Sequence, residues 1–272
     1  MLVRFQERID LGKIARSGQC FRCAETGPDS YRFLTGRYAV LCRQQGPQSV
    51  EADCTPAEWK AVWERYFDAG RSYQAVLDAI DPADGFLQSA ARCGEGIRIL
   101  RQDPWEMLVT FIVSQRKSIP AIRRAVEALA ALCGEPLDGP GGTLFAFPTA
   151  EALARQSAAE LSGCGLGYRV PYVQDAARRV ASGSLCMEQL ALLDDAALSQ
   201  ALKTVHGVGE KVANCVMLFG YGRVDRAPVD VWIQKIIDQR YGGVSPFAEH
   251  ETAAGILQQY LFYYAQTHKE EF

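Results

Sequence analysis

The chain has 272 residues, of which 48% are hydrophobic and 22% are charged, which is typical of globular proteins and excludes a disordered chain. Its 29 Lys and Arg residues against 32 Asp and Glu residues give a net charge of −3. This excludes a globally basic surface but allows a local basic groove. The length fits one large domain or two to three small ones.

The nine cysteines are scattered, and only Cys20 and Cys23 form a C-x-x-C pair. This pattern is typical of reduced thiols in an intracellular protein, and we interpret the pair as two strand thiols. Without a second pair, we expect no zinc or iron–sulfur site. The charged segment 1–10 does not resemble a signal peptide, and no run of about 18 apolar residues predicts a membrane span.

Residues 1–60 are expected to form a small antiparallel sheet. Short aromatic and β-branched runs, such as residues 31–36, alternate there with Gly, Pro and Asp. Beyond Thr55 the pattern becomes helical. Residues 55–58 (TPAE) predict an N-cap, a first-turn proline and a capping box, and residues 103–106 (DPWE) repeat that pattern.

The remainder of the chain is predicted to be mostly helical. Ser118 can cap a helix that runs to about Cys133, and the Gly/Pro-rich stretch 134–143 indicates a linker or long loop. Further helices are predicted over residues 149–156, 170–182, 195–204, 210–219, 231–240 and 249–266. The sequence therefore predicts an α+β fold, with an N-terminal antiparallel sheet followed by a mostly α-helical body.

The most informative segment is residues 202–213, with the sequence LKTVHGVGEKVA. A helix is predicted to end near Lys203, and a tight hairpin follows in which Gly207 and Gly209 can take positive φ. Such a hairpin lets backbone N–H groups at the start of the next helix approach a phosphate of a nucleic acid. A plain packing unit of two helices is the alternative, because one G-x-G is a weak signal.

Two residues near this hairpin are candidates for chemistry. Lys211 stands at the start of an apolar helix, where partial burial can turn an amine into a nucleophile; the alternative is a solvated lysine. Asp230 follows Pro228 and Val229, and it is either a functional carboxylate or the N-cap of the helix that starts at Val231.

Several separated motifs in this order resemble the helix–hairpin–helix DNA glycosylase superfamily, and more narrowly the bacterial, clostridial-like branch of the 8-oxoguanine DNA glycosylases. They cover nearly the whole length and lie at residues 17–22 (SGQCFR), 96–104 (GIRILRQDP), 147–148, 165–169 (GLGYR), 208–215, 228–230 and 254–262. The resemblance implies an N-terminal domain of sheet plus helices over residues 1–95. A helical glycosylase body over 96–272 would follow, with the helix–hairpin–helix at about 195–219.

The resemblance implies a base-excision-repair enzyme with DNA glycosylase and AP lyase activity, which flips 8-oxoguanine out of duplex DNA. Lys211 holds the position of the lysine that attacks C1′ and forms a Schiff base before β-elimination. Asp230 holds that of the carboxylate that assists the lysine and offsets charge on the sugar. Two alternatives stay open: a glycosylase of this fold for another oxidised or alkylated base, and a non-catalytic DNA-binding module.

The resemblance also assigns residues to the base and to DNA. The Gly18 carbonyl would accept from N7–H, which guanine lacks, Gln258 would read the Watson–Crick edge, and Cys215 and Phe262 would sandwich the base. The base-binding set also contains Pro228. The DNA-binding set comprises Arg116, Tyr168 as a wedge in the stack, Arg169 facing the opposite strand, Gly207, Gly209 and Trp232.

The resemblance requires no cofactor. The backbone carbonyls of Lys203, Val205 and Val208 match a hairpin site for a structural monovalent or divalent cation. No iron–sulfur cluster is expected, because no cysteine follows Cys215. The implied partner is damaged double-stranded DNA, and the implied protein is a bacterial, cytoplasmic, nucleoid-associated monomer with no membrane contact.

Three positions depart from the family pattern. Arg116 stands where an asparagine is usual, Ala121 replaces the arginine that reads the estranged cytosine, and Trp232 replaces a histidine that faces a phosphate. Because alanine cannot hydrogen-bond a base edge, we expect a weak preference for the opposite base.

Overall fold

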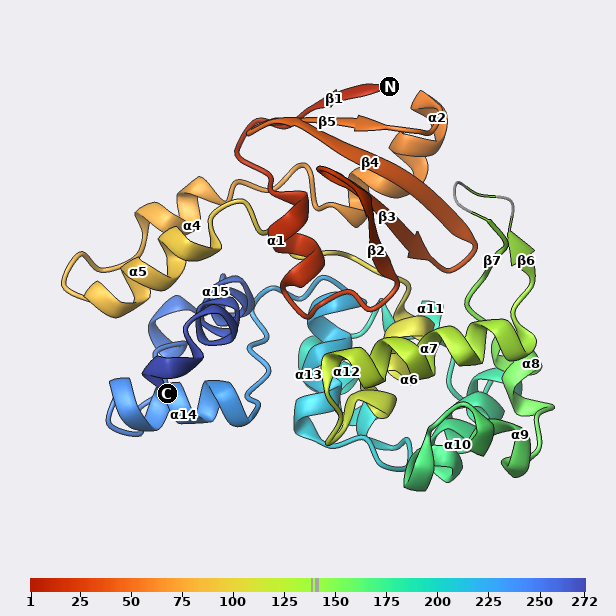
Figure 1. Ribbon diagram of the computed structural model, residues 1–272. Coiled ribbons are helices and arrows are strands. Elements are labelled where there is room, and N and C mark those ends of the chain that lie inside the picture. The colour runs from red at the N-terminus through yellow and green to blue at the C-terminus, as the bar shows by residue number, and fades with distance from the viewer. Residues whose placement is uncertain (138, 140–141) are drawn as a thin grey trace.

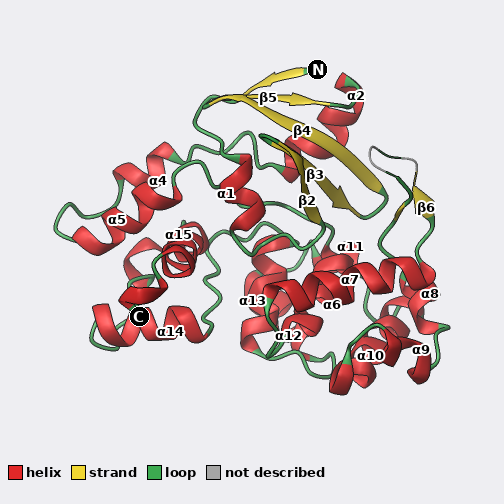
Figure 2. Cartoon of the chain, viewed as in Figure 1, coloured by secondary structure: helices red, strands yellow, loops and turns green. Residues whose placement is uncertain are grey.

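A computed structural model describes residues 1–137, 139 and 142–272 of the chain. An antiparallel sheet lies at one end of the molecule, and helices form the rest (Figures 1 and 2). The predicted α+β fold is therefore confirmed. No helix in the described part of the chain is long and apolar enough to cross a membrane.

The five-stranded sheet is antiparallel throughout, in the order β1-β5-β4-β3-β2. Phe33 pairs with Val40 across β3 and β4, and both are fully buried. Trp59 and Phe67 stack on the same core from the helical segment that follows the sheet. The strands are β1 (Leu2–Arg4), β2 (Cys23–Gly27), β3 (Ser30–Thr35), β4 (Tyr38–Gly46) and β5 (Ser49–Ala52).

All nine cysteines are free thiols. Cys23 begins β2 and is buried, whereas Cys20 lies in the preceding loop with its Sγ 3.4 Å from the Tyr66 hydroxyl. The interpretation of this pair as two strand thiols is therefore correct for Cys23 alone.

The two predicted N-caps are correct, but neither predicted capping box closes. The Thr55 and Asp103 side chains accept from the backbone N–H groups of Glu58 and Glu106 at 3.1 and 2.8 Å. The Glu58 carboxylate instead accepts from an indole N–H, and Glu106 accepts from the backbone N–H of Gly36 at 2.8 Å. Glu106 thereby joins its helix to the β3–β4 turn, and burial raises its pKa to about 8.

The helical body encloses a second core, in which α6 is buried along most of its length. The helices are α1 (Leu11–Arg16), α2 (Pro56–Glu58), a π-helical turn η1 (Trp59–Trp63), α3 (Glu64–Tyr66), α4 (Gln74–Asp78), α5 (Gly85–Gly94), α6 (Pro104–Ser114), α7 (Ile119–Cys133), α8 (Ala150–Ala154), α9 (Ala158–Gly163), α10 (Val170–Ala181), α11 (Met187–Leu190), α12 (Asp195–Lys203), α13 (Glu210–Phe219), α14 (Val231–Arg240) and α15 (Ala254–Thr267). Short 3₁₀ turns are η2 (Gly167–Arg169), η3 (Ala248–His250) and η4 (Lys269–Glu271).

The predicted helix over 249–266 is divided into η3 and α15, while the helices predicted over 210–219 and 231–240 match α13 and α14. The predicted linker over 134–143 contains β6 (Pro136–Leu137), which pairs with β7 (Leu144–Phe145). Three residues of that linker, 138, 140 and 141, lie outside the described residues.

Helix α5 packs closely against α15, so residues 85–94 share a core with residues near position 260. A Cβ atom at Gly94 would lie 2.4 Å from the Tyr260 ring, which explains why glycine occupies this crossing. The division of the chain into two domains at residue 95 stays a prediction. Helix α5, which precedes that position, shares the core of the helical body.

Candidate active site

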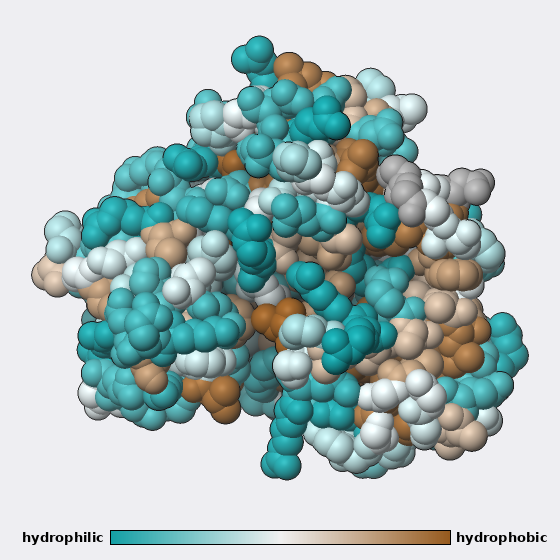
Figure 3. Space-filling model, in the orientation of Figure 1, coloured by the Kyte–Doolittle hydropathy of each residue, from teal (hydrophilic) through white to brown (hydrophobic). Residues whose placement is uncertain are grey.

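A cavity of about 1000 Å³ opens between the loop around Gly18, the α6–α7 loop and helices α13, α14 and α15. On the face in Figure 3, the molecule is hollowed between the lobe with α14 and α15 and the lobe with α7 and α13. All of the expected catalytic and base-binding residues line this cavity, together with two of the DNA-binding ones. They are Gly18, Arg116, Lys211, Cys215, Pro228, Asp230, Trp232, Gln258 and Phe262.

Lys211 is the second residue of α13, and its helix position brings the side chain to the cavity. Its Nζ lies 5.2 Å from the centre of the Phe111 ring, so the amine has an apolar neighbour on one side. Cys215 follows one turn along the same helix. Burial raises the pKa of the Cys215 thiol, and the charge of Lys211 partly offsets that rise.

Asp230 both caps a helix and faces the cavity. Its Oδ1 accepts from the backbone N–H groups of Trp232 and Ile233 at 3.0 and 2.9 Å, as expected of the N-cap of α14. The other carboxylate oxygen accepts no hydrogen bond within the described chain, and no ion pair joins Asp230 to Lys211 there. The two expected roles of Asp230 are therefore compatible with each other.

Gly18 needs to be glycine for two reasons. Its φ is +75°, and a Cβ atom would lie 2.8 Å from Cε1 of Phe262. The same cavity wall carries Gln258, which is 5% exposed and whose Oε1 is buried without a hydrogen-bond partner in the described residues. A buried acceptor of this kind calls for a donor from a bound molecule, such as an N–H on the edge of a base.

Three loops border one edge of the cavity, and hydrogen bonds of Gln115 connect them. The Gln115 side chain donates to the Gly207 carbonyl of the hairpin at 3.1 Å. Its own carbonyl accepts from the Tyr168 hydroxyl at 3.5 Å and from the Arg169 guanidinium. Tyr168 is 52% exposed, which the expected role of this side chain as a wedge in a DNA stack requires. We call the residues 115–117, 165–169 and 205–209 the rim of the cavity.

The expectation that Arg169 faces a DNA strand is wrong. Arg169 is only 5% exposed, and its guanidinium donates to the Leu166 carbonyl at 3.1 Å and to the Gln115 carbonyl. It also lies 4.2 Å from the centre of the Tyr168 ring. Arg169 therefore supports the exposed tyrosine from inside the protein.

The hairpin glycines differ from each other. Gly207 has φ +81°, and a Cβ atom there would lie 2.4 Å from the Tyr172 ring. Gly209 has φ −100°, with open space around it, and is the N-cap of α13. Positive φ is thus confirmed at Gly207 and wrong at Gly209, where an extended N-cap residue starts the helix.

The three carbonyls expected at a hairpin cation are not equivalent. The Val205 carbonyl accepts from the backbone N–H of Val208 at 3.0 Å. The Lys203 and Val208 carbonyls accept no hydrogen bond within the described residues, so they fit the donor set of a cation site. Among all the residues that the structure describes, no cluster of His, Cys, Asp and Glu could hold a metal ion.

Other residues line the cavity without having been expected there, among them Phe111, Gln259 and Lys269. Phe111 belongs to a continuous apolar run, which gives no sign that one ring faces a cavity. Gln259 is different, because a glutamine in the apolar helix α15 is a signal that sequence reasoning could have used.

Two family models match the chain. The model of the 8-oxoguanine DNA glycosylase N-terminal domain matches residues 1–108. The model of the HhH-GPD superfamily of base excision DNA repair proteins matches residues 109–259, directly after it.

Curated relatives agree with these models. An N-glycosylase/DNA lyase of Saccharomyces cerevisiae is 34% identical over 266 residues, covering 87% of this chain and 69% of the yeast protein. The N-glycosylase/DNA lyase OGG1 of Arabidopsis thaliana is 28% identical over 81% of this chain. The present chain spans 63% of the length of that plant protein.

The 8-oxoguanine glycosylase/lyase of Clostridium acetobutylicum, solved with double-stranded DNA containing cytosine opposite 8-oxoG, has a TM-score of 0.91 and 31% identity. The match covers 99% of this chain and 98% of that one. Both the sheet and the helical body are therefore shared. The chain belongs to the HhH-GPD superfamily of base excision DNA repair proteins, and its N-terminal part belongs to the 8-oxoguanine DNA glycosylase N-terminal domain family.

Proposed function

We propose that this protein is a bifunctional DNA glycosylase and AP lyase that removes 8-oxoguanine from duplex DNA. The observation that carries the proposal is that Lys211, Asp230 and Gly18 line one cavity although they lie far apart in the sequence. An amine nucleophile, a carboxylate and a selective acceptor thus border a space large enough for a base.

The reaction begins when the damaged nucleotide leaves the stack and its base enters the cavity. The neutral amine of Lys211 forms a bond to C1′ as the bond from C1′ to the base breaks, and the base leaves with the electron pair and takes up a proton. The Asp230 carboxylate offsets the positive charge that develops on the sugar.

The lyase step follows from the same bond. Loss of a proton from the lysine nitrogen and opening of the sugar ring give a Schiff base between Nζ of Lys211 and C1′. Removal of a C2′ proton then expels the 3′ phosphate by β-elimination and cuts the strand. Attack by water regenerates the lysine amine.

Selectivity for the oxidised base follows from hydrogen-bond polarity. 8-Oxoguanine carries a proton on N7, which the Gly18 carbonyl can accept, whereas guanine presents a lone pair to the same oxygen. The free Oε1 of Gln258 can accept from the N–H groups of the Watson–Crick edge. Phe262 and Cys215 then hold the two faces of the base.

Borohydride trapping tests the proposal. With a duplex that contains 8-oxoguanine opposite cytosine, the wild type should give a covalent protein–DNA adduct, and Lys211→Gln should give none. Lys235→Gln is the matched control, because Lys235 is an exposed lysine of α14 that donates to Phe272. Loss of the adduct in that control as well would contradict the assignment.

Two outcomes would favour the alternatives. No adduct on any lesion, with DNA binding intact, would favour a non-catalytic DNA-binding module. A panel of duplexes in which another oxidised or alkylated base is excised faster would favour a glycosylase of the same fold with a different substrate.

We further propose that the protein binds damaged double-stranded DNA as a monomer, in the cytoplasm where the bacterial chromosome lies. The carbonyls of Lys203 and Val208 would hold a structural cation next to a DNA phosphate. Affinity for an abasic duplex should then be higher in K⁺ than in tetramethylammonium at equal ionic strength, and equal affinity would contradict the cation site.

A further inference from the structure

Three successive carbonyls of the loop that lines the cavity have different partners. The Ser17 carbonyl accepts from the Gln259 side chain at 2.7 Å, and the Gln19 carbonyl accepts from the Gln102 side chain at 2.8 Å. The Gly18 carbonyl between them accepts no hydrogen bond from any residue that the structure describes. Two glutamine amides thus occupy the carbonyls on both sides of the one that remains free.

This arrangement is deeply buried. Ser17 and Gln19 are fully inaccessible, while Gln259 and Gln102 are 2% and 4% exposed. Replacing one of these amides by an apolar side chain would leave a buried carbonyl without a donor, which is costly. The peptide planes before and after the one that carries the Gly18 carbonyl are therefore held, although the φ of +75° at Gly18 makes this a bend in the chain.

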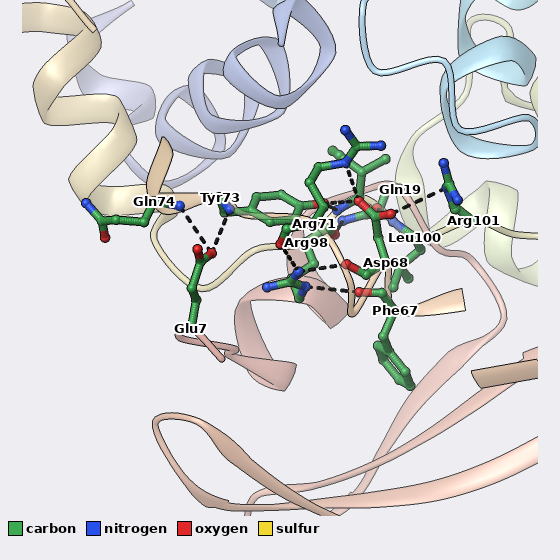
Figure 4. Close-up of polar contacts among 11 residues, drawn as sticks. Glu7, Gln19, Phe67, Asp68, Arg71, Tyr73, Gln74, Arg98, Leu100 and Arg101 are labelled. Carbon is green, nitrogen blue, oxygen red and sulfur yellow. Dashed lines mark hydrogen bonds and ion pairs between the residues drawn. The ribbon is translucent and has the colours of Figure 1, made fainter. Parts of the chain in front are cut away.

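Gln19 connects the loop to the core of the N-terminal region. Its Oε1 accepts from the backbone N–H of Leu100 at 2.7 Å, and its Nε2 donates to the Arg98 carbonyl at 3.0 Å. Figure 4 draws Gln19 and Leu100 in one group of polar contacts with the buried Arg98. That guanidinium donates to the Phe67 and Asp68 carbonyls at 3.0 and 2.7 Å.

We propose that Gln102 and Gln259 are positioning residues for damage recognition. By occupying the neighbouring carbonyls, they leave the Gly18 carbonyl as a free acceptor between two bonded ones and fix its direction relative to the base. The proposal rests on the proposed function, since it explains how the Gly18 carbonyl is held for N7–H.

A purely structural role of the two glutamines makes a different prediction. A destabilised protein loses base excision and strand cleavage together. A misplaced Gly18 carbonyl impairs only the step that needs a base. A preformed abasic site requires Lys211 and the DNA contacts but presents no N7–H, so it separates the two roles.

The experiment compares Gln102→Met and Gln259→Met with the wild type on two duplexes under single-turnover conditions. One duplex carries 8-oxoguanine and the other a preformed abasic site. Excision of 8-oxoguanine should fall about tenfold in each variant, while cleavage at the abasic site should stay within about twofold of wild type. Gln102 is the sharper probe, because it does not line the cavity and its side chain bonds to the loop at the Gln19 carbonyl.

Gln44→Met is the matched control. Its amide also holds backbone carbonyls, those of Ile9 and Gly46 at 3.0 and 2.6 Å, but it lies in β4 and does not line the cavity. It should lower the melting temperature and leave the ratio of excision to abasic cleavage unchanged.

Four outcomes decide between the inference and its alternatives. Unchanged excision by Gln102→Met, or parallel loss of both activities in the glutamine variants, would overturn the positioning role. If Gln44→Met changed the ratio as much as the two loop variants, the effect would not be specific to Gly18. Failure of the wild type to act on either duplex would instead overturn the proposed function itself.

Discussion

The cavity and its rim are built by different kinds of contact. The cavity wall joins distant parts of the chain through buried groups, as where Gly18 meets Phe262 and where Gln259 holds the Ser17 carbonyl. The rim consists of three loops. Gln115, in the loop 115–117, hydrogen-bonds to Gly207 in the second loop and to Tyr168 in the third. Substitutions in the cavity should therefore change chemistry at constant DNA affinity, and substitutions in the rim should do the reverse.

The largest effect is expected for Asp230→Asn in the cavity. Asparagine caps helices as well as aspartate does, so α14 should keep its start, whereas the negative charge beside the sugar is lost. Excision should fall by about 10²–10³-fold with unchanged affinity for an abasic duplex, measured in single turnovers and by titration. Asp194→Asn, which alters the N-cap of α12, is the control. A large loss of affinity in Asp230→Asn would contradict the separation of cavity and rim.

The choice of the base opposite the lesion depends on a position outside both regions, Ala121 of α7, which lies between the cavity-lining residues Pro120 and Ile122. Because Ala121 offers no side-chain hydrogen bond, excision opposite cytosine should exceed excision opposite adenine by less than about a hundredfold. Single-turnover rates on the two duplexes measure this preference, and Ala121→Arg should increase it. A wild-type preference above that limit would mean that another residue reads the estranged base.

A smaller effect is expected for Gly207→Ala in the rim. The added Cβ would lie 2.4 Å from the Tyr172 ring, at a φ of +81° that alanine rarely adopts. Affinity for an abasic duplex should fall about tenfold, with near-normal excision at saturating protein. Gly209→Ala is the matched control, because its Cβ would meet open space at φ −100°. Equal losses in both variants would show that the turn geometry is not the cause.

The smallest effect concerns Glu106, which lies outside both regions. Burial raises its pKa to about 8, so the folded state favours the protonated carboxyl. Its contribution to stability is therefore complete below its unfolded pKa and is lost as the pH rises through about 8.

Glu106→Gln removes this titration and keeps an oxygen acceptor for Gly36. From about pH 5 to pH 9, the melting temperature of Glu106→Gln should gain about 7 °C relative to that of the wild type. Calorimetry at both pH values measures the change, with the exposed Glu64→Gln as control. A parallel pH dependence in wild type and variant would mean that the buried carboxyl does not titrate in this range.

Local signals predicted elements well where the chain supplied its own caps. The start of α14 follows from Asp230, because the two backbone N–H groups that its side chain caps lie within three residues of it. The two capping boxes failed because Glu58 and Glu106 found partners outside the predicted pattern, and for Glu106 that partner is a turn of the sheet. A propensity rule cannot include a partner that only the tertiary structure brings near.

The candidate site divides in the same way. The family motifs predicted a shared site for Lys211, Asp230 and Phe262, and all three line one cavity. Each lies on a helix or at its cap, which local sequence signals predict. Arg169 could not be predicted, because its direction depends on a carbonyl from the separate 115–117 loop. The role inferred for Gln259 was equally hidden, because its partner lies 242 residues away in the sequence.

The contact between Gly18 and α15 also bears on the order in which the site is completed during synthesis. Domains begin to fold from the N-terminus while the ribosome is still adding residues. Lys211 leaves the ribosome before Gln259 and Phe262, so the proposed nucleophile exists before the wall proposed to select its substrate. A nascent chain that ended before α15 would expose the proposed nucleophile in an open groove, without the helix whose Gln258, Gln259 and Phe262 are proposed to complete the base site.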